Sequence, residues 1–321
     1  MSIARLLITS TLLLMSCSRS TITAAEEPAA TVDESAQEVE PGTETADLPD
    51  GLTPLNPQKT VLIDPKRKRV FLKSRVSLRE GLLEMFACLA GTKEHESVVA
   101  IETDAYVIHA ALLSIGAEPG APVQFDPEYK PPTGQHIDVF VNWTDDRGRP
   151  YRVPAQYWMR HATRRYHIEP LAKFPTDAQL PEEGDMRYDD KRQQLIWFGI
   201  MSDDQRYEYM AVSRDEAYRK ALQNIFDKSQ VRPMEADFIF AGSGFWEDET
   251  GKKSYLAESG NLICVANFSD AIIDVDVQSD ASNESLMFEP YTERIPPMDT
   301  EVLVELVPRF HEPNKSSDTE R

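Results

Sequence analysis

Short apolar stretches alternate with turn residues from position 59 to position 308, a pattern typical of a strand-rich chain. The stretch 61–64, the basic turn 65–69 and the stretch 70–78 predict two strands joined by a tight connection. We interpret the basic run 66–69 as a solvated hairpin tip rather than an anion-binding patch. Further strands are predicted over residues 82–86, 97–101, 136–141, 238–240, 262–265 and 302–307.

One almost wholly apolar run predicts a helix, with Asp104 placed to cap its start and Gly116 its end. Its polar exceptions are His109 and Ser114. A helix that is apolar all round is buried on most sides, so His109 enters the interior or lines a cleft. Two readings remain open for His109: a neutral ring hydrogen-bonded to backbone, or a catalytic or ligand-binding group.

The composition changes between residues 161 and 234, where charges of both signs mix with a proline-flanked linker (170–181) and a strand-like run (194–200). Ser213 and Glu216 form a predicted capping box at the start of a second helix. One stripe of this helix is expected to be buried: Ala217, Tyr218, Ala221, Leu222 and Ile225. We therefore predict an α+β fold: a β-rich single domain over 58–308, with antiparallel or mixed sheets, one buried helix and an inserted α/β subregion. Residues 309–321 are predicted to be a disordered C-terminal tail.

The first 17 residues have the pattern of a cleaved export signal, because Arg5 precedes a ten-residue apolar run (6–15). A membrane-spanning helix needs about 20 such residues. The run ends in Leu14, Met15, Ser16 and Cys17, and it resembles the lipobox of bacterial lipoproteins. That resemblance implies a lipid on Cys17, which would anchor the protein to a membrane of the cell envelope, facing the periplasm or the exterior. The alternative is an ordinary secretory signal in which Cys17 is incidental.

Charge changes the picture at two levels. The 321 residues contain 54 acidic and 34 basic side chains, for a net charge of −20, which argues against a nucleic-acid partner. Residues 18–57 contain one arginine, nine acidic residues and no aromatic residue, which predicts a disordered acidic tether. The whole chain is 41% hydrophobic and 27% charged, as expected for a globular protein.

The densest group of reactive side chains lies in residues 88–97. The catalytic candidates are Cys88, His95 and Glu96. The candidates for binding a ligand are Thr92, Lys93, His95, Glu96, Ser97, His109 and Ser243. Two histidines and a glutamate suit zinc, so His95 and His109 are the candidate metal ligands if the fold brings them together. In an extended strand, however, His95 and Glu96 would point to opposite faces.

The cysteines other than Cys17 allow three readings. Cys88 and Cys264 form a disulfide in an oxidising envelope, or Cys264 is a small core residue, or Cys88 is a nucleophile whose pKa is lowered beside Lys93.

Gly242 and Gly244 flank Ser243 directly after a predicted strand. A nucleophile elbow requires a following helix, whereas the acidic turn 247–251 follows here, so this route to a hydrolase is excluded. The glycines instead predict a bend with positive φ angles.

Four ordered segments carry a family resemblance: GLLEMFACLAGTKEHESVVAIETDAYVIHAALLSIGAEPGAPVQF, IFAGSGFW, YLAESGNLICVANFSDAIIDV and RIPPMDTEV. The sequence resembles the YdjY-domain family of bacterial envelope proteins over about 59–160 and 235–308, with 161–234 as an extra block. The shared features include the pair His95 and Glu96, the Gly-Ser turn, and two prolines followed by Thr300. The resemblance implies the same fold and little chemistry. The family carries a ferredoxin-like label in places, yet no iron–sulfur cluster is expected here, since such a cluster needs about four thiolates and only Cys88 and Cys264 remain.

Together these patterns favour a lipid-anchored envelope protein that binds a small ligand or an envelope protein in a polar cleft around 92–97, His109 and 242–244. In this hypothesis Lys93 recognises an anion, and His95 and Glu96 orient it. The alternatives are an enzyme that depends on a metal or a thiol, through His95 and His109 or through Cys88, and a non-catalytic scaffold.

Overall fold

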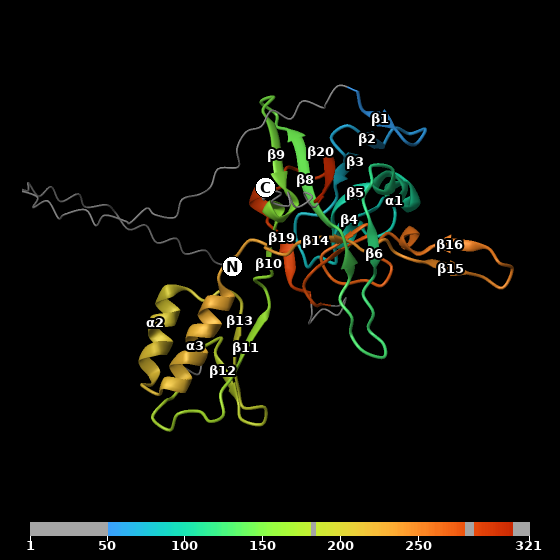
Figure 1. The fold of residues 1–321 in the computed structure, drawn as a ribbon. Helices are drawn as coiled ribbons and strands as arrows, with labels where there is room; N and C mark the ends of the chain where they lie inside the picture. The colour runs from blue at the N-terminus through green and yellow to red at the C-terminus, as the bar shows by residue number, and fades with distance from the viewer. Residues whose placement is uncertain (1–50, 181–183, 280–285, 311–321) are drawn as a thin grey trace, which may run out of the picture. The chain divides into compact units, whose positions relative to one another are not determined.

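A closed mixed sheet dominates the computed structural model, which describes residues 51–180, 184–279 and 286–310 (Figure 1). Its main sheet contains eleven strands in these residues, and eight of them form a ring that the pairing of β3 with β5 closes. In order around the ring, these strands are β3 (Arg69–Val76), β20 (Glu301–Pro308), β8 (His136–Thr144), β14 (Phe238–Phe240), β18 (Ile273–Val275), β17 (Ile263–Cys264), β4 (Met85–Leu89) and β5 (Ser97–Ile101). The other three strands are β1 (Thr53–Pro54), β2 (Val61–Asp64) and β9 (Pro150–Pro154), which flank the ring.

The ring is mixed, because β4 pairs with β5 and β17 pairs with β18 in parallel, whereas its other pairs are antiparallel. The β-rich α+β class is confirmed at this coarse level. The strand predicted at 82–86 begins later, at Met85. The smaller two-stranded sheets are β6 (Pro119–Ala121) with β7 (Thr133–Gly134), β10 (Met159–His161) with β19 (Phe288–Pro290), and β15 (Phe245–Glu247) with β16 (Lys253–Tyr255).

Strand alternation separates an apolar interior from a polar outer face. The interior side of three neighbouring strands consists almost wholly of buried aliphatic residues: Val70, Leu72 and Val76 of β3, Val302, Val304 and Leu306 of β20, and Ile137, Val139 and Val141 of β8. Each fully buried side chain of this kind contributes roughly 1.5–3 kcal/mol. The intervening positions, which include Lys73, Glu301 and Glu305, therefore lie on the outer face.

Helix α1 (Ala105–Ser114) packs by one face rather than on most sides, because Tyr106 and Leu113 are exposed. Asp104 makes no side-chain capping bond. Instead Glu258, in the 3-10 turn η3 (Leu256–Ser259), accepts the backbone N–H groups of Ala105 and Tyr106 at 3.0 and 3.1 Å. The predicted C-terminal glycine is correct, since Gly116 adopts a φ of 87°. The other 3-10 turns are η1 (Glu94–Glu96), η2 (Ala155–Trp158) and η4 (Thr292–Arg294).

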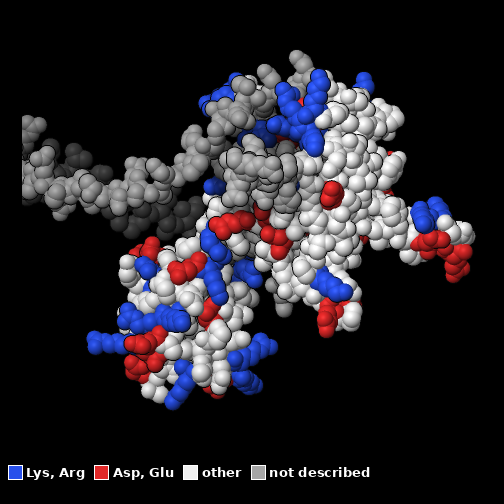
Figure 2. Space-filling view, in the orientation of Figure 1, with Lys and Arg blue, Asp and Glu red and all other residues white. Residues whose placement is uncertain are grey.

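The block at 161–234 has a hydrophobic core of its own. Its three-stranded sheet consists of β11 (Tyr166–Pro170), β13 (Gln194–Phe198) and β12 (Arg187–Asp189), and its helices are α2 (Asp203–Val212) and α3 (Glu216–Ser229). Its core includes Trp197, Tyr218 and Leu222. As the mixed composition predicts, its surface carries both signs of charge (Figure 2, lower left), whereas much of the main sheet at the right of that view is white.

The helix signals in this block were only partly correct. Ser213 ends α2 rather than starting α3, and Asp215 caps α3 by accepting the backbone N–H of Tyr218 at 2.9 Å. The capping box is formed by Ser202 and Gln205, at the start of α2, a helix that the sequence analysis missed. Four members of the predicted stripe are buried, but Ala217 is exposed.

The predicted tether and tail are both too long. Residues 51–57 are ordered enough to form β1, and Asn56 accepts the backbone N–H groups of Thr60 and Val61. Arg309 donates to Asp138 and Asp237 at 2.8 Å, so it belongs to the fold. The signal, Cys17 and the tether up to residue 50 lie outside the described residues, as does the tail from residue 311. Within the described residues, no helix is long and apolar enough to cross a membrane.

Candidate functional site

The outer face of the sheet contains a groove of about 670 Å³ over β3, β20 and β8. One side of β3 has two partners, since residues 69–72 pair with β2 and residues 74–76 pair with β5. The change of partner falls at Lys73, between these two pairings. The groove is lined by Thr60, Phe71, Lys73, Ser74, Arg75, Ala100, Glu102, Asn142, Trp143, Thr144, Asp299, Glu301, Val302 and Leu303.

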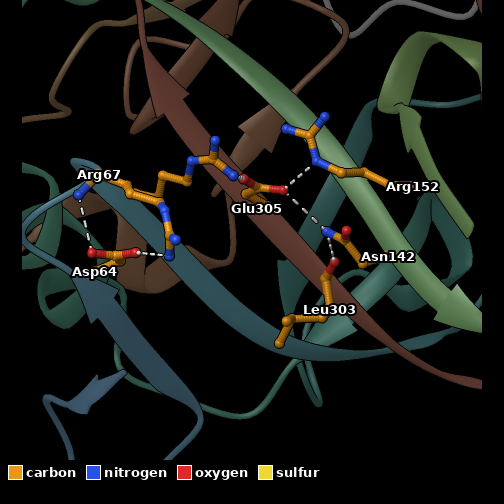
Figure 3. A network of polar contacts seen from close by, with 7 residues as sticks. Asp64, Arg67, Asn142, Arg152, Leu303 and Glu305 are labelled. Atoms are coloured by element: carbon orange, nitrogen blue, oxygen red, sulfur yellow. Dashed lines mark hydrogen bonds and ion pairs between the residues drawn. The ribbon is translucent and has the colours of Figure 1, made fainter. Parts of the chain in front are cut away.

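A buried ion network adjoins the groove (Figure 3). Glu305 is 1% exposed, and one of its oxygens accepts from Arg69 while the other accepts from Arg152, each at 2.8 Å. Asn142 donates to Glu305 and to the carbonyl oxygen of Leu303, both at 3.3 Å. The Arg152 guanidinium also lies 3.6 Å from the centre of the Phe140 ring. Because a buried carboxylate is stable only when it is compensated, this network fixes the side chains around it.

The groove itself carries charges of a different kind. Lys73, Glu102 and Glu301 are exposed, and none has an ion-pair partner among the described residues. Arg75 lies opposite Glu301 in the register, yet its guanidinium reaches Glu94 at 3.6 Å and Asp299 at 3.5 Å instead. One ammonium and two carboxylates therefore remain available to a ligand.

The predicted residues 92–97 form a separate charged cluster at one end of β5. Lys93 Nζ lies 3.3 Å from Glu84 Oε2 and 4.7 Å from the centre of the Phe268 ring. Burial and a hydrogen bond shared with Glu96 raise the pKa of Glu84, although Lys93 opposes them. Lys93, which was predicted to recognise an anion, is therefore already paired with the Glu84 carboxylate.

His95 and Glu96 lie side by side rather than on opposite faces, because residues 94–96 form the turn η1 and the strand begins at Ser97. His95 Nε2 lies 3.1 Å from Glu96 Oε1, and the His95 side chain is 72% exposed. Thr92 and Ser97 donate to the backbone carbonyls of Leu89 and Val99.

His109 and Ser243 belong to a second cluster, built around Tyr255. The Tyr255 hydroxyl donates to the Gly242 carbonyl at 3.1 Å and lies 2.7 Å from His109 Nδ1. Burial lowers the pKa of His109, although a hydrogen bond with the Gly242 backbone opposes that shift, so the ring is neutral near pH 7. Ser243 donates to the Asp270 carbonyl at 2.7 Å. Gly242 has a φ of 89°, and a Cβ atom there would lie 2.7 Å from Pro119.

The two histidines predicted as metal ligands are not brought together. Residues 97–101 form β5, which spans roughly 13 Å, and His95 precedes this strand while His109 follows it on α1. Their neighbours differ throughout: Glu96 for His95, and Tyr255 with Phe240 for His109. No group of three or more His, Cys, Asp or Glu residues in the described parts of the chain is arranged to hold a metal ion.

Cys88 and Cys264, the two cysteines in the described residues, are free and buried, so they do not form the disulfide considered above. They belong to one small apolar cluster with Met85, Ala100 and Ala271. Burial raises the pKa of the Cys88 thiol, the opposite of what a nucleophile requires, and burial raises the pKa of Cys264 as well.

A buried carboxyl group escaped the sequence analysis. Asp274 has no exposed surface, and desolvation raises its pKa to about 7, although hydrogen bonds from Val275 and Asn267 oppose that shift. Its Oδ1 accepts from Val275 N at 2.8 Å and from Asn267 Nδ2 at 3.2 Å, while Oδ2 has no partner among the described residues. The available signal was one aspartate inside an otherwise apolar run (271–275).

Comparison with known proteins gives one family. A search of curated proteins and a search of solved structures each returned no match. The segment 235–308, part of the resemblance seen in the sequence, lies outside the family match, which instead extends into the block that begins at 161. The match includes β3 and β8 of the groove but not β20. Residues 61–184 of the chain match the family model described as the YdjY domain.

Proposed function

We propose that this protein binds a small ligand in the groove over β3, β20 and β8, at the cell envelope. The observation that supports this most directly is the groove of about 670 Å³, which falls within the range of roughly 300–1,000 Å³ typical of small-molecule sites. Its lining combines apolar side chains with a few charged and amide groups, the mixture that such sites use to hold and orient a ligand.

The neighbouring ion network supports a binding role, because a site needs side chains that are held before the ligand arrives. Asn142 lines the groove and donates a hydrogen bond to Glu305, which two arginines hold in turn. Because these side chains are held before binding, a ligand would lose less binding free energy to ordering them.

Binding is a better account than catalysis at this site. The groove lining contains no histidine and no cysteine. His109 is occupied by Tyr255, and the Cys88 thiol is buried with a raised pKa. The cleft that the sequence analysis centred on residues 92–97 is replaced in this proposal by the groove on the outer face.

Envelope anchoring is proposed from the sequence. The apolar run 6–15 and the motif that ends in Cys17 support lipid attachment. Cys17→Ala is expected to abolish incorporation of radiolabelled palmitate and to release the protein from the membrane fraction. Unchanged labelling would refute the lipid anchor and would leave the proposal about the groove unaffected.

The groove is tested by filling it. Thr144 is exposed in the lining, so Thr144→Trp would occupy space that the ligand needs. The full chain is screened by thermal shift against amino acids, dipeptides, sugars, nucleotides and organic acids. We expect at least one class to raise the Tm of the wild-type protein and to lose that effect in Thr144→Trp. Thr250→Trp, on the exposed turn between β15 and β16, is the matched control that keeps it. A screen without shifts, or shifts that survive in Thr144→Trp, would refute the proposal.

A further inference from the structure

We infer that the ligand of the groove is a zwitterion of dipeptide size, whose carboxylate meets Lys73 and whose ammonium group meets Glu301. This inference rests on the proposed function, since it assigns a chemical class to the same groove. It depends on three features of the lining: which charges are unpaired, how far apart they lie, and which other ligand chemistries the lining disfavours.

The unpaired charges have opposite signs. Lys73 on β3 and Glu301 on β20 both line the groove, and neither has an ion-pair partner among the described residues. Arg75 lies opposite Glu301 in the register but is directed toward Glu94 and Asp299. A ligand with only one charge would leave Lys73 or Glu301 without a partner, whereas a zwitterion satisfies both and leaves only the exposed Glu102 to solvent.

The register of these two residues guides the choice of ligand size. Lys73 pairs with Leu303, and Arg75 pairs with Glu301, so Lys73 and Glu301 are diagonal neighbours on one face. The backbone positions of diagonal neighbours lie roughly 7–8 Å apart, so a ligand of similar length can lie along this diagonal. Two residues of extended chain span at most about 7 Å, which matches a dipeptide.

The middle of the groove suits a peptide unit. Leu303 lies between Lys73 and Asn142 in adjacent strands and is half-buried, so it offers an apolar surface beside both charged residues. Asn142 lines the groove on the other side of Leu303, and its Nδ2 is held by Glu305 and the Leu303 carbonyl, so a ligand that reaches β8 meets an ordered amide.

Two other ligand chemistries fit less well. Trp143 stacks on Tyr151 at 4.8 Å with an interplanar angle of 11° and also contacts Trp158, so its ring is engaged inside the protein rather than offered to a sugar. A simple anion would meet three lining carboxylates, Glu102, Asp299 and Glu301, against the two cations Lys73 and Arg75.

The test uses glycyl-leucine and two derivatives that each lack one of its charges: the N-acetylated form lacks the ammonium group, and the C-terminal amide lacks the carboxylate. Their dissociation constants for the full chain are measured by isothermal titration calorimetry. Removing either charge is expected to weaken binding by about fivefold, as for a partly exposed ion pair. In Glu301→Gln the free dipeptide and its acetylated form should bind equally, and in Lys73→Met the free dipeptide and its amide should bind equally. Glu247→Gln, an exposed carboxylate on β15, is the matched control that changes nothing.

The outcomes separate the inference from the proposed function. Equal binding of all three probes, no binding up to about 10 mM, or discrimination that survives Glu301→Gln and Lys73→Met would each overturn the zwitterion assignment. If that happens while another class from the screen still binds and loses its Tm shift in Thr144→Trp, the groove remains a ligand site of different chemistry. If no class binds, both conclusions fail.

Discussion

Glu305 and Glu301 lie four residues apart on β20 and point to the same face of the sheet, but their surroundings differ completely. Glu305 is 1% exposed and held by Arg69 and Arg152, whereas Glu301 is exposed and has no ion-pair partner among the described residues. A carboxylate that loses its water must gain cations, while an exposed one is stable alone. The first therefore belongs to the framework, and the second is available for binding.

The largest effect is expected from breaking the buried network. Glu305→Ala leaves two arginines without their partner, and removal of one partner from a buried pair costs about 3–5 kcal/mol. The Arg69 and Arg152 side chains are 33% and 20% exposed, so water compensates them in part and we expect a loss of about 3 kcal/mol. Urea denaturation measures this loss. A loss below about 1 kcal/mol would show that Glu305 is not part of the framework.

Asp274 extends the comparison, because it is a buried carboxyl group that, unlike Glu305, has no ion-pair partner among the described residues. The pKa of Asp274 is raised to about 7, so the folded protein keeps a proton that the unfolded chain releases near pH 4. Stability attributable to this group is present below about pH 4, falls as the pH rises, and is fully lost above about pH 7. The loss is on the order of 2–4 kcal/mol.

Asp274→Asn cannot ionise and keeps an acceptor for Asn267 and Val275, so it should remove this pH dependence. The free energy of unfolding, measured between pH 4 and pH 8, should fall more steeply in the wild-type protein than in the variant. Parallel profiles for the two proteins would contradict the account of Asp274.

The smallest effect on stability is expected in the groove. Glu301→Gln and Lys73→Met remove exposed charges that have no ion-pair partner among the described residues, so each should change the free energy of unfolding by less than about 0.5 kcal/mol. The same urea measurements provide the check. A loss comparable to that of Glu305→Ala would place these residues in the framework and erase the contrast between the two regions.

Local patterns predicted the framework well where one signal dominates. The strands at 61–64, 97–101 and 238–240 begin and end as predicted, because each is a short apolar run between turn residues. Capping was harder to predict, since competing acceptors lie close together: Asp215 displaced Ser213 at the start of α3, and Glu258 reaches α1 from a distant segment. The Glu258 contact is tertiary, so a local pattern does not contain it, whereas Asp215 and Ser213 were rival acceptors within one local pattern.

The candidate site was less accessible to sequence reasoning. Residues 88–97 are rich in reactive groups along the chain, but the fold gives these groups separate partners. Lys93 pairs with Glu84, His95 contacts Glu96, and Thr92 donates to a backbone carbonyl. The groove instead joins β3, β8 and β20, whose residues lie up to about 230 positions apart. A charged residue inside the apolar run 302–308 was the one local sign of the Glu305 network.

The most direct test is a crystal structure of the full chain with glycyl-leucine bound. The account predicts the dipeptide in the groove over β3, β20 and β8, with its ammonium group within hydrogen-bonding distance of Glu301 and its carboxylate beside Lys73. A dipeptide found elsewhere on the protein, or bound in the groove with both charged groups turned toward solvent, would contradict it.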